Sequence, residues 1–291
     1  MLNRQKVLLY ILQKTDRLVS RLELTKWSFL LHKETASMGG SAFYEFVPYH
    51  YGPFSFGLYY DIKGLLKKGY IEEGNNKSWK ITRPIVVWKS VKNLNKAVKN
   101  DVDNIMRKYA GSPIKNVIDY IYDKYPWYTV NARSGSRFSK KTGKIAVYTA
   151  GYEGTQIDGF LNFLLQNGIQ RIIDVRKNPI ARRYGFHKST LNRLCDNLNI
   201  DYHHFPELGI PSSLRKNLSG DNDYQKLFSL YNKTVINDEQ SSIKTVTNLI
   251  NEKTSVLICS EADPAHCHRS HLAVPISENS GLDIKHLRTH V

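Results

Sequence analysis

Cysteine is scarce in this chain of 291 residues, and no long apolar run occurs in it. Three cysteines are too few for the disulfide framework of a small secreted protein, which favours a reducing cytoplasm. No apolar stretch approaches the ~20 residues that cross a bilayer. The N-terminus leads straight into an amphipathic pattern without the apolar core of a signal peptide. We therefore expect a cytoplasmic protein with no membrane partner.

Motifs for common cofactors are also missing. The chain has no G-x-G-x-x-G pattern and no P-loop lysine, so neither a dinucleotide nor a nucleoside triphosphate is indicated. It also has no C-x-x-C pair of the kind found in zinc knuckles. We accordingly expect no cofactor and no metal.

Acidic side chains are outnumbered by basic ones. The chain has 42 Lys and Arg against 26 Asp and Glu, which gives a formal net charge of +16. Such a chain attracts polyanions at neutral pH, and nucleic acid or a nucleotide is the partner that this charge favours. The alternative is an enzyme whose lysines are merely solvated.

A change in composition predicts where the chain divides. Residues 133–144 are small, polar and cationic, as is typical of a domain boundary. We expect a winged-helix-like α+β domain at 1–85, a basic helical connector and linker at 86–143, and an α/β domain at 144–291. Within the connector, helical patterns cover 102–109 and 112–125.

The N-terminal pattern has the element order of a winged helix-turn-helix. Helical periodicity covers 4–15, 21–33 and 55–68, and turn residues separate two short strand patterns at 70–72 and 78–82. In such folds a helix can enter the major groove while the wing touches the backbone, so DNA is favoured over RNA. The candidate contacts are the lysines at the end of the third helix and on the wing, which are Lys67, Lys68, Lys77 and Lys80.

Short motifs around the third helix resemble those of the Panacea domain, which is found in antitoxins. They are Gly52-Pro53 before the helix and Leu65-x3-Gly69-Tyr70-Ile71 after it, and the resemblance covers about residues 5 to 85. It implies toxin neutralisation and protein contacts. A docking or dimerisation module, and with it a homodimer, is therefore the alternative to DNA binding.

The C-terminal half alternates strand and helix patterns. Strands are expected at 145–149, 171–175, 201–205 and 255–259, and helices at 157–167, 188–198, 224–237, 241–252 and from 268 onward. This alternation predicts a parallel, three-layer, Rossmann-like sheet. Functional side chains should gather where the strands end.

Each predicted strand is followed by candidate site residues. The candidate ligand- or phosphate-binding residues are Tyr148, Gly151, Tyr152, Arg176, Arg182, Arg183, His268 and Arg269. The candidate catalytic residues are Asp174, Glu207, Glu261 and Cys267. We expect Tyr152, Asp174, Arg176, Glu207, Glu261 and Arg269 to meet at one rim of the sheet.

Four motifs at these strand ends resemble the DUF488 family over residues 144 to 275. They are Tyr148-Thr-x-Gly151-Tyr152, Asp174-Val-Arg176-x2-Pro179 with Arg182-Arg183, His204-x-Pro206-Glu207-Leu208-Gly209, and Cys259-x-Glu261-x5-Cys267-His268-Arg269. The resemblance implies the fold and the site. It implies no reaction, because the family name records none.

Several kinds of chemistry fit these residues. Base-directed or N-glycosidic hydrolysis would use Glu207 or Glu261 to activate water, while Asp174 positions the sugar. A sensor would bind the same ligand without chemistry. Thiol or sulfur transfer would use Cys267.

Zinc is a further alternative at the last strand end. Its four ligands would be Cys259, Cys267, His268 and one of His266 or His271. The spacing is no recognised ligand pattern, so we favour hydrolysis on a nucleotide or nucleic acid.

Overall fold

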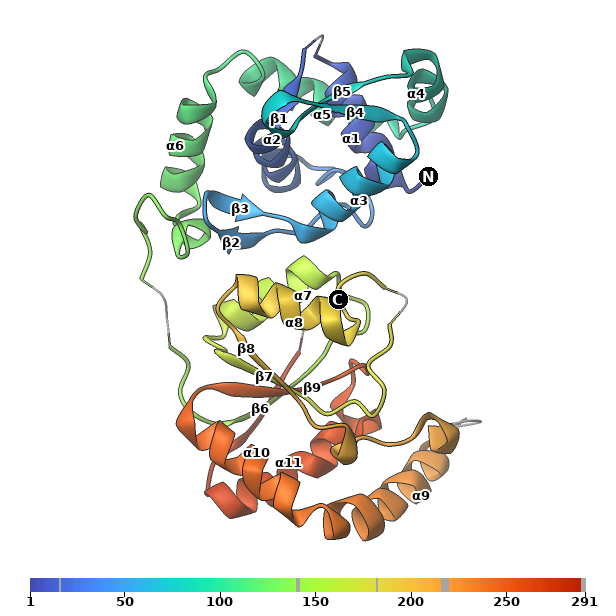
Figure 1. Ribbon diagram of the computed structural model, residues 1–291, viewed down its shortest axis with the longest axis vertical. Helices are drawn as coiled ribbons and strands as arrows, with labels where there is room; N and C mark the ends of the chain where they lie inside the picture. The colour runs from blue at the N-terminus through green and yellow to red at the C-terminus, as the bar shows by residue number, and fades with distance from the viewer. Residues whose placement is uncertain (16, 140–141, 182, 216–219, 289–291) are drawn as a thin grey trace. The chain divides into compact units, whose positions relative to one another are not determined.

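The structure is a computed structural model that describes residues 1–288 apart from 16, 140–141, 182 and 216–219 (Figure 1). It divides into two compact units, residues 1–139 and 140–291. Among the described residues, no helix combines the length and the apolar character needed to cross a membrane.

The first unit begins with a winged-helix-like arrangement. Its elements are α1 (Asn3–Gln13), β1 (Val19–Ser20), α2 (Arg21–Glu34), β2 (Val47–Tyr49), β3 (Gly52–Phe54), α3 (Phe56–Lys67), β4 (Ile71–Gly74), η1 (Asn75–Lys77) and β5 (Ser78–Ile81). Strands β1, β5 and β4 form an antiparallel sheet in that order, and β2 pairs with β3 as a separate hairpin. The expected smaller α+β fold is confirmed.

Capping residues fix where α2 and α3 begin. The Ser20 hydroxyl accepts a hydrogen bond from the backbone N–H of Glu23, whose carboxylate reaches back to the backbone of Ser20. The Ser55 hydroxyl accepts a hydrogen bond from the backbone N–H of Leu58 at 3.2 Å. These bonds satisfy donors that the first helical turns would otherwise leave unpaired.

The segment expected to connect the two domains forms helices that belong to the first unit. They are α4 (Pro84–Val91), α5 (Lys96–Tyr109), α6 (Ile114–Lys124) and the short η2 (Pro126–Thr129). Their apolar faces join the same core as α1 and α2, with Val87, Val102, Ile121 and Tyr128 buried in it. All four tryptophans, Trp27, Trp79, Trp88 and Trp127, therefore lie in the first unit.

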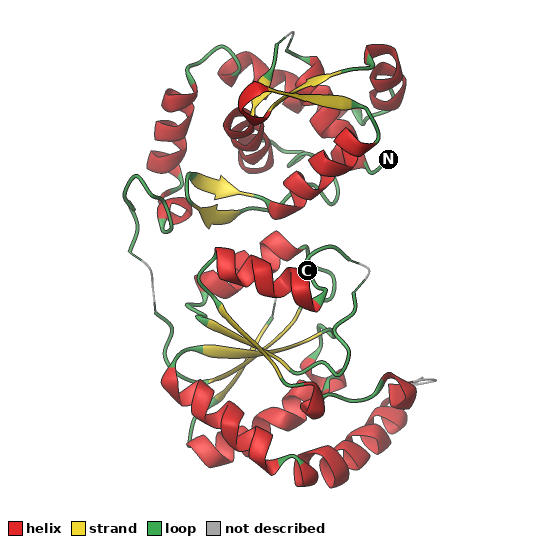
Figure 2. Ribbon diagram, viewed as in Figure 1, coloured by secondary structure: helices red, strands yellow, loops and turns green. Residues whose placement is uncertain are grey.

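The second unit is a three-layer α/β domain (Figure 2). Its elements are β6 (Val147–Gly151), α7 (Ile157–Gln166), β7 (Arg171–Asp174), α8 (Lys188–Asn197), β8 (Asp201–His204), η3 (Pro206–Leu208), η4 (Ser212–Arg215), α9 (Asp221–Tyr231), η5 (Asn232–Ile236), α10 (Gln240–Glu252), β9 (Ser255–Cys259), η6 (Pro264–His266), α11 (His268–Ser280) and β10 (Ile284–Leu287). All five strands are parallel, in the order β10-β6-β9-β7-β8. Helices α7 and α8 cover one face, and α10 and α11 cover the other (Figure 1). The predicted α/β class is confirmed.

The sheet places three strand ends side by side. Gly151 at the end of β6 lies opposite Cys259 at the end of β9, and Ile258 lies opposite Asp174 at the end of β7. The three strands are almost wholly buried because helices cover both faces, and this is why most residues of β6 and β9 are apolar. The loops that follow them meet at one edge of the sheet.

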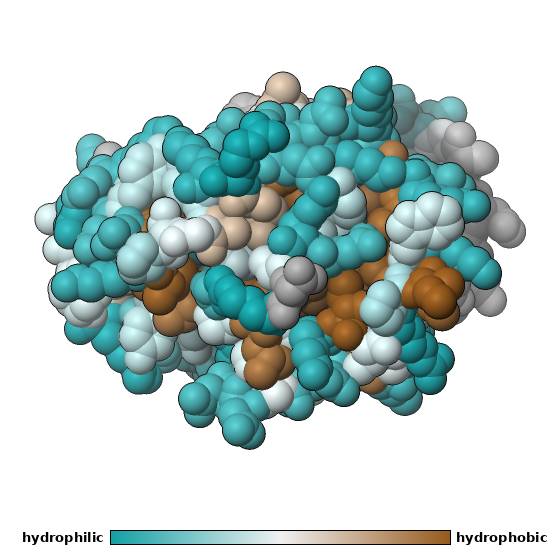
Figure 3. Space-filling model, turned by 90° about the horizontal axis from the view of Figure 1, so that it is seen from above, coloured by the Kyte–Doolittle hydropathy of each residue, from teal (hydrophilic) through white to brown (hydrophobic). Residues whose placement is uncertain are grey.

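One face of the described surface is mostly hydrophilic, with separate apolar patches. Figure 3 shows such patches among polar side chains on one face. Ile85 and Trp88 of α4 are the largest exposed apolar side chains of that helix, at 73% and 56% exposure.

Candidate functional site

The densest cluster of reactive side chains lies where β9 ends and α11 begins. The thiol of Cys259 donates to Oε2 of Glu261 at 2.9 Å, and the thiol of Cys267 donates to the same oxygen at 3.1 Å. Both cysteines are buried and free of disulfides. One carboxylate oxygen thus holds two thiols together at the rim of the sheet.

His268 completes this cluster from the first turn of α11. Its Nδ1 lies 3.7 Å from Sγ of Cys259. Its Nε2 lies 3.0 Å from the carbonyl oxygen of Val175, which follows β7. Because a carbonyl can only accept, Nε2 carries the proton and Nδ1 faces the thiols.

Arg215 binds the cluster from η4. Its Nη1 donates to Oε1 of Glu261 at 2.8 Å, and its Nη2 lies 3.2 Å from Nδ1 of His268. Glu261 and Arg215 are each 28% exposed, so the ion pair is partly open to solvent.

A cavity of about 240 Å³ opens beside this ion pair. Its walls are Ile210, Arg215, Tyr224, Leu227, Phe228, Glu261, His266 and His268. The cavity therefore combines aromatic side chains from α9 with a carboxylate and a guanidinium, as ligand pockets commonly do.

Burial and mutual contact shift the pKa values of the cluster. Burial raises the pKa of Cys259, but the contacts with Cys267 and His268 outweigh it and lower that pKa well below its usual range. Burial and the neighbouring Cys259 raise the pKa of Cys267. Burial and the charge of Cys259 also raise the pKa of Glu261.

Gly151 lets the loop after β9 pass close to the end of β6. A Cβ atom at this position would lie 1.8 Å from the backbone oxygen of Glu261. The backbone N–H of Glu153 donates to Ser260, and the carboxylate of Glu153 accepts from the backbone N–H of Ala262. Glycine is required here because of the close approach, and the neighbouring bonds hold Glu261 in place.

Asp174 and Arg176 form a second, buried cluster. The guanidinium of Arg176 donates to both oxygens of Asp174, at 2.8 and 2.5 Å, and also to the hydroxyl of Tyr152 and the carbonyl of Phe186. The hydroxyl of Tyr202 donates to Asp174 at 2.6 Å. Asp174 is fully buried. Its oxygens are thus occupied within the protein.

Two further residues of the predicted set also have internal partners. Arg269 is fully buried and donates to the backbone oxygens of Glu261 and Ala262, at 2.5 and 3.0 Å. The hydroxyl of Tyr148 donates to the backbone of Lys144. Arg269 therefore shapes the loop that carries Glu261.

Glu207 and Arg183 contact groups outside the thiol cluster. Glu207 accepts from the hydroxyl of Ser242 at 2.9 Å, and Arg183 donates to the backbone oxygen of Thr155. Arg182 lies outside the described residues.

Only part of the four-ligand zinc set comes together. The donor atoms of Cys259, Cys267 and His268 all lie within 4.8 Å of one another. His266 instead contacts Asp221 and Asp263, and the ring of His271 lies against Phe228. Glu261 is the carboxylate that contacts both thiols.

Sequence reasoning missed Arg215, Tyr202 and the aromatic side chains of α9. Arg215 lies in a short 3-10 helix with no motif around it. Tyr202 belongs to a strand whose residues are all half-buried, so no alternation of buried and exposed residues singled it out. The helical pattern around Tyr224 predicted a helix but gave no sign that its aromatic side chains line a cavity.

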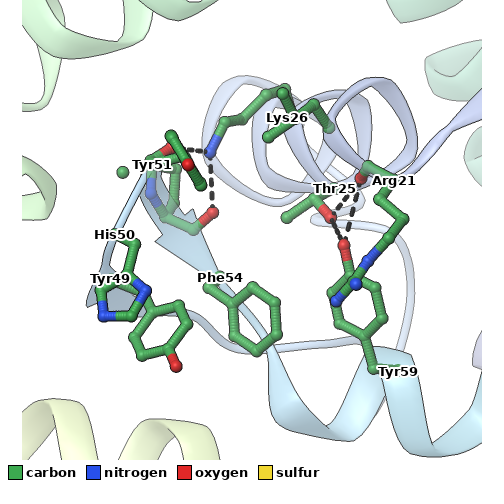
Figure 4. Close-up of a pocket in the computed structure, with 11 residues that line it drawn as sticks. Arg21, Thr25, Lys26, Tyr49, His50, Tyr51, Phe54 and Tyr59 are labelled. Carbon is green, nitrogen blue, oxygen red and sulfur yellow. Dashed lines mark hydrogen bonds between the residues drawn. The ribbon is translucent and has the colours of Figure 1, made fainter. Parts of the chain in front are cut away.

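The first unit holds a separate cavity of about 430 Å³ between α2, the β2–β3 hairpin and α3 (Figure 4). Rings of Tyr49 and His50 stack at 4.0 Å between centroids, and those of Phe54 and Tyr59 stack at 4.6 Å. Lys26 is fully buried at its edge, where its ammonium donates to the carbonyls of Tyr51 and Pro53. Burial lowers the pKa of Lys26 to about 7.

The four lysines predicted to contact nucleic acid are exposed. Lys67 and Lys68 lie at the end of α3, and Lys77 lies at the tip of the hairpin. Lys80 pairs with Glu72 across the hairpin at 3.0 Å. The hairpin thus carries charges of both signs.

One family model matches part of the second unit. Residues 156–275 match the family described as "Domain of unknown function DUF488". The match contains the second, third and fourth motifs but begins after Tyr152. This family match does not cover residues 5 to 85, so their resemblance to the Panacea domain stays a prediction. Comparisons with curated proteins and with solved structures find no match. The second unit of this chain therefore contains a DUF488 domain at residues 156–275.

Proposed function

We propose that the second unit hydrolyses a carbon–nitrogen bond in a nucleotide or nucleic acid, either the N-glycosidic bond or a bond of the base itself. The observation that carries this proposal is the Glu261–Arg215 ion pair, at 2.8 Å, on the wall of a cavity with Tyr224 and Phe228. The cavity offers aromatic contacts, an anion ligand and an acid–base group to one small ligand.

Glu261 is the best candidate for the acid–base role. It is partly exposed in the cavity, whereas Asp174 is fully buried against Arg176 and Tyr202. Glu207 contacts Ser242 and does not line the cavity. Asp174 therefore serves as a positioning residue in this proposal, through Arg176 and Tyr152.

The reaction needs one water and no further reactant. Water adds to the carbon that bears the leaving nitrogen, and Glu261 takes a proton from that water. Glu261 then passes the proton to the nitrogen as the carbon–nitrogen bond breaks. Arg215 binds a phosphate or another anionic group of the substrate.

The first unit supports a nucleic-acid substrate over a free nucleotide. The net charge of +16 favours polyanions. The winged-helix-like unit offers exposed lysines on α3 and on the hairpin. In this proposal the first unit binds DNA and the second unit acts on a base.

Glu261→Gln tests the catalytic proposal. Purified protein is incubated with nucleosides, 5′-nucleotides and single- and double-stranded oligonucleotides, and released base and ammonia are measured. Wild-type protein should release one of these products, and Glu261→Gln should lower kcat by roughly 10²- to 10⁴-fold. The matched control is Glu278→Gln, which changes an exposed carboxylate on α11 and should keep wild-type activity.

Binding without turnover is the competing function. If wild-type protein and Glu261→Gln bind an oligonucleotide equally and neither releases a product, the hydrolase is refuted and a sensor remains. Sulfur transfer through Cys267 is less well supported, because that thiol is 1% exposed.

A further inference from the structure

We propose that Cys259, Cys267 and His268 bind one divalent metal ion of the zinc class. The proposal concerns the site to which the hydrolytic function was assigned above, but it does not depend on the reaction. It can be tested in the absence of any substrate.

Three donor atoms of suitable type converge at this point. Two sulfur atoms and one imidazole nitrogen lie within 4.8 Å of one another, and all three residues are buried. Cys259 comes from the end of β9, while Cys267 and His268 come from the start of α11. A strand and the helix that follows it therefore present the donors on a rigid support.

The orientation of His268 is that of a metal ligand. Its Nε2 donates to the carbonyl of Val175, so the lone pair that can bind an ion is on Nδ1, the atom nearest the thiols. Histidine ligands commonly donate their other ring N–H to a carbonyl or a carboxylate, which fixes the ring.

The charges of the contacting groups balance when an ion is bound. Two thiolates neutralise a divalent ion, and Arg215 neutralises Glu261 at 2.8 Å. Without an ion, two buried thiols share one carboxylate oxygen of Glu261, and the buried imidazole of His268 lies beside Cys259 and Arg215. Buried charges are tolerated when they are paired, so the ion suits this pocket electrostatically.

The donor set selects the class of metal. Thiolate and imidazole ligands favour zinc and related transition metals, whereas magnesium and calcium prefer oxygen ligands. Three protein ligands that leave one position open are typical of catalytic zinc sites. Two cysteines, a histidine and a nearby glutamate that is no ligand also form the site of zinc-dependent base deaminases. In this chain Glu261 would be the acid–base group beside a bound water.

Metal content and cobalt substitution test the proposal on the intact wild-type chain. Protein purified without chelators should contain about one zinc per chain, which a chromogenic chelator releases. After removal of zinc, titration with Co²⁺ should produce thiolate-to-metal charge-transfer absorption that saturates at one equivalent.

Variants locate the ion. Cys259→Ser and Cys267→Ser should each lose charge-transfer intensity. Loss of a residue that only supports a ligand weakens metal binding by roughly 10- to 100-fold, so loss of a ligand itself should weaken Co²⁺ binding by more than that. Cys195→Ala is the matched control, because Cys195 is a buried cysteine on α8, outside the donor set. It should bind Co²⁺ as wild type does.

Two results would overturn the proposal. One is wild-type protein that binds neither zinc nor Co²⁺ above background; the other is Co²⁺ binding by Cys259→Ser equal to that of wild type. The first result is measured on wild-type protein alone, so it does not depend on whether the variants fold. Metal binding without any hydrolysis would refute the proposed function and leave the metal site standing.

Discussion

At the residue scale, Lys26 is an ammonium group enclosed by protein. It is fully buried, and it donates hydrogen bonds to two backbone carbonyls (Figure 4). Burial lowers its pKa from 10.5 to about 7, because the charged form loses its hydration. A proton on Lys26 therefore costs the folded state more than it costs the unfolded chain.

The stability of the first unit should depend on this proton. Between pH 7 and 10.5 the unfolded chain keeps the proton and the folded protein has released it, so raising the pH favours folding. The free energy of unfolding of wild type minus that of Lys26→Met should rise by about 1.4 kcal/mol per pH unit above pH 7. Urea unfolding followed by tryptophan fluorescence measures it, because every tryptophan lies in this unit.

The exposed Lys67→Met serves as the control for removing one positive charge. A difference between wild type and Lys26→Met that stays constant from pH 6.5 to 9 would contradict the prediction. Such a result would mean that Lys26 keeps its proton in the folded protein.

Sequence reasoning identified which residues line the sheet edge better than it identified what they do. Cys267, His268 and Glu261 were singled out from one motif, and the structure brings them together with Cys259. Asp174 and Arg176 were also expected there, but their partner Tyr202 comes from another strand. Whether a charged side chain faces a ligand or the protein depends on such distant partners, which a local pattern does not contain.

At the scale of elements, the end of β6 and the loop after β9 lie very close together at Gly151. A methyl group there cannot fit without moving the backbone of Glu261. The loop carries Glu261 and leads into Cys267, so the displacement would reach both groups.

Gly151→Ala should therefore disrupt the site while leaving the first unit intact. We expect it to lower the free energy of unfolding of the second unit by about 1–3 kcal/mol and to weaken Co²⁺ binding. Far-UV circular dichroism on heating and Co²⁺ titration measure the two effects. Gly64→Ala on α3 is the control: nothing lies within 4 Å of its Cβ position, and it should be neutral or slightly stabilising. Unchanged Co²⁺ affinity in Gly151→Ala would exclude coupling between this loop and the metal ligands.

A fully buried strand was predicted well, whereas a helix with little amphipathic contrast and a strand at the sheet edge were not. The strand Ser255–Cys259 was predicted to the residue, because it is wholly buried and bounded by polar residues. The helix Pro84–Val91 was read as part of a connector. Four consecutive apolar residues at 85–88 give it little amphipathic contrast, and only Val87 and Val91 are buried. The strand Ile284–Leu287 was missed, since it lies at the sheet edge and two of its four residues are exposed.

At the scale of the whole molecule, the net charge of +16 should govern association with nucleic acid. If the protein binds through phosphate contacts, binding releases counterions, and the logarithm of the association constant falls linearly with the logarithm of salt concentration. Fluorescence anisotropy of labelled duplex DNA and single-stranded RNA between 50 and 200 mM salt should show this fall, with DNA bound more tightly.

Charge reversal locates the contact surface. Lys67→Glu combined with Lys77→Glu should weaken DNA binding about tenfold or more and reduce the salt slope. Lys244→Glu, which reverses an exposed lysine on α10, is the matched control and should bind as wild type does. Equal affinity of all three proteins would mean that α3 and the hairpin do not contact DNA.

The strand order of the second unit bears on how the chain folds during synthesis. Strand β6 is made first, yet its two neighbours, β9 and β10, come from residues 255–259 and 284–287. Until those residues leave the ribosome, β6 is an apolar strand with two unpaired edges. The first unit draws its sheet from residues 19–81 and can close it much earlier. Such non-local pairing is slow and exposes edges to aggregation, so the second unit should set the pace at which newly made chains become native.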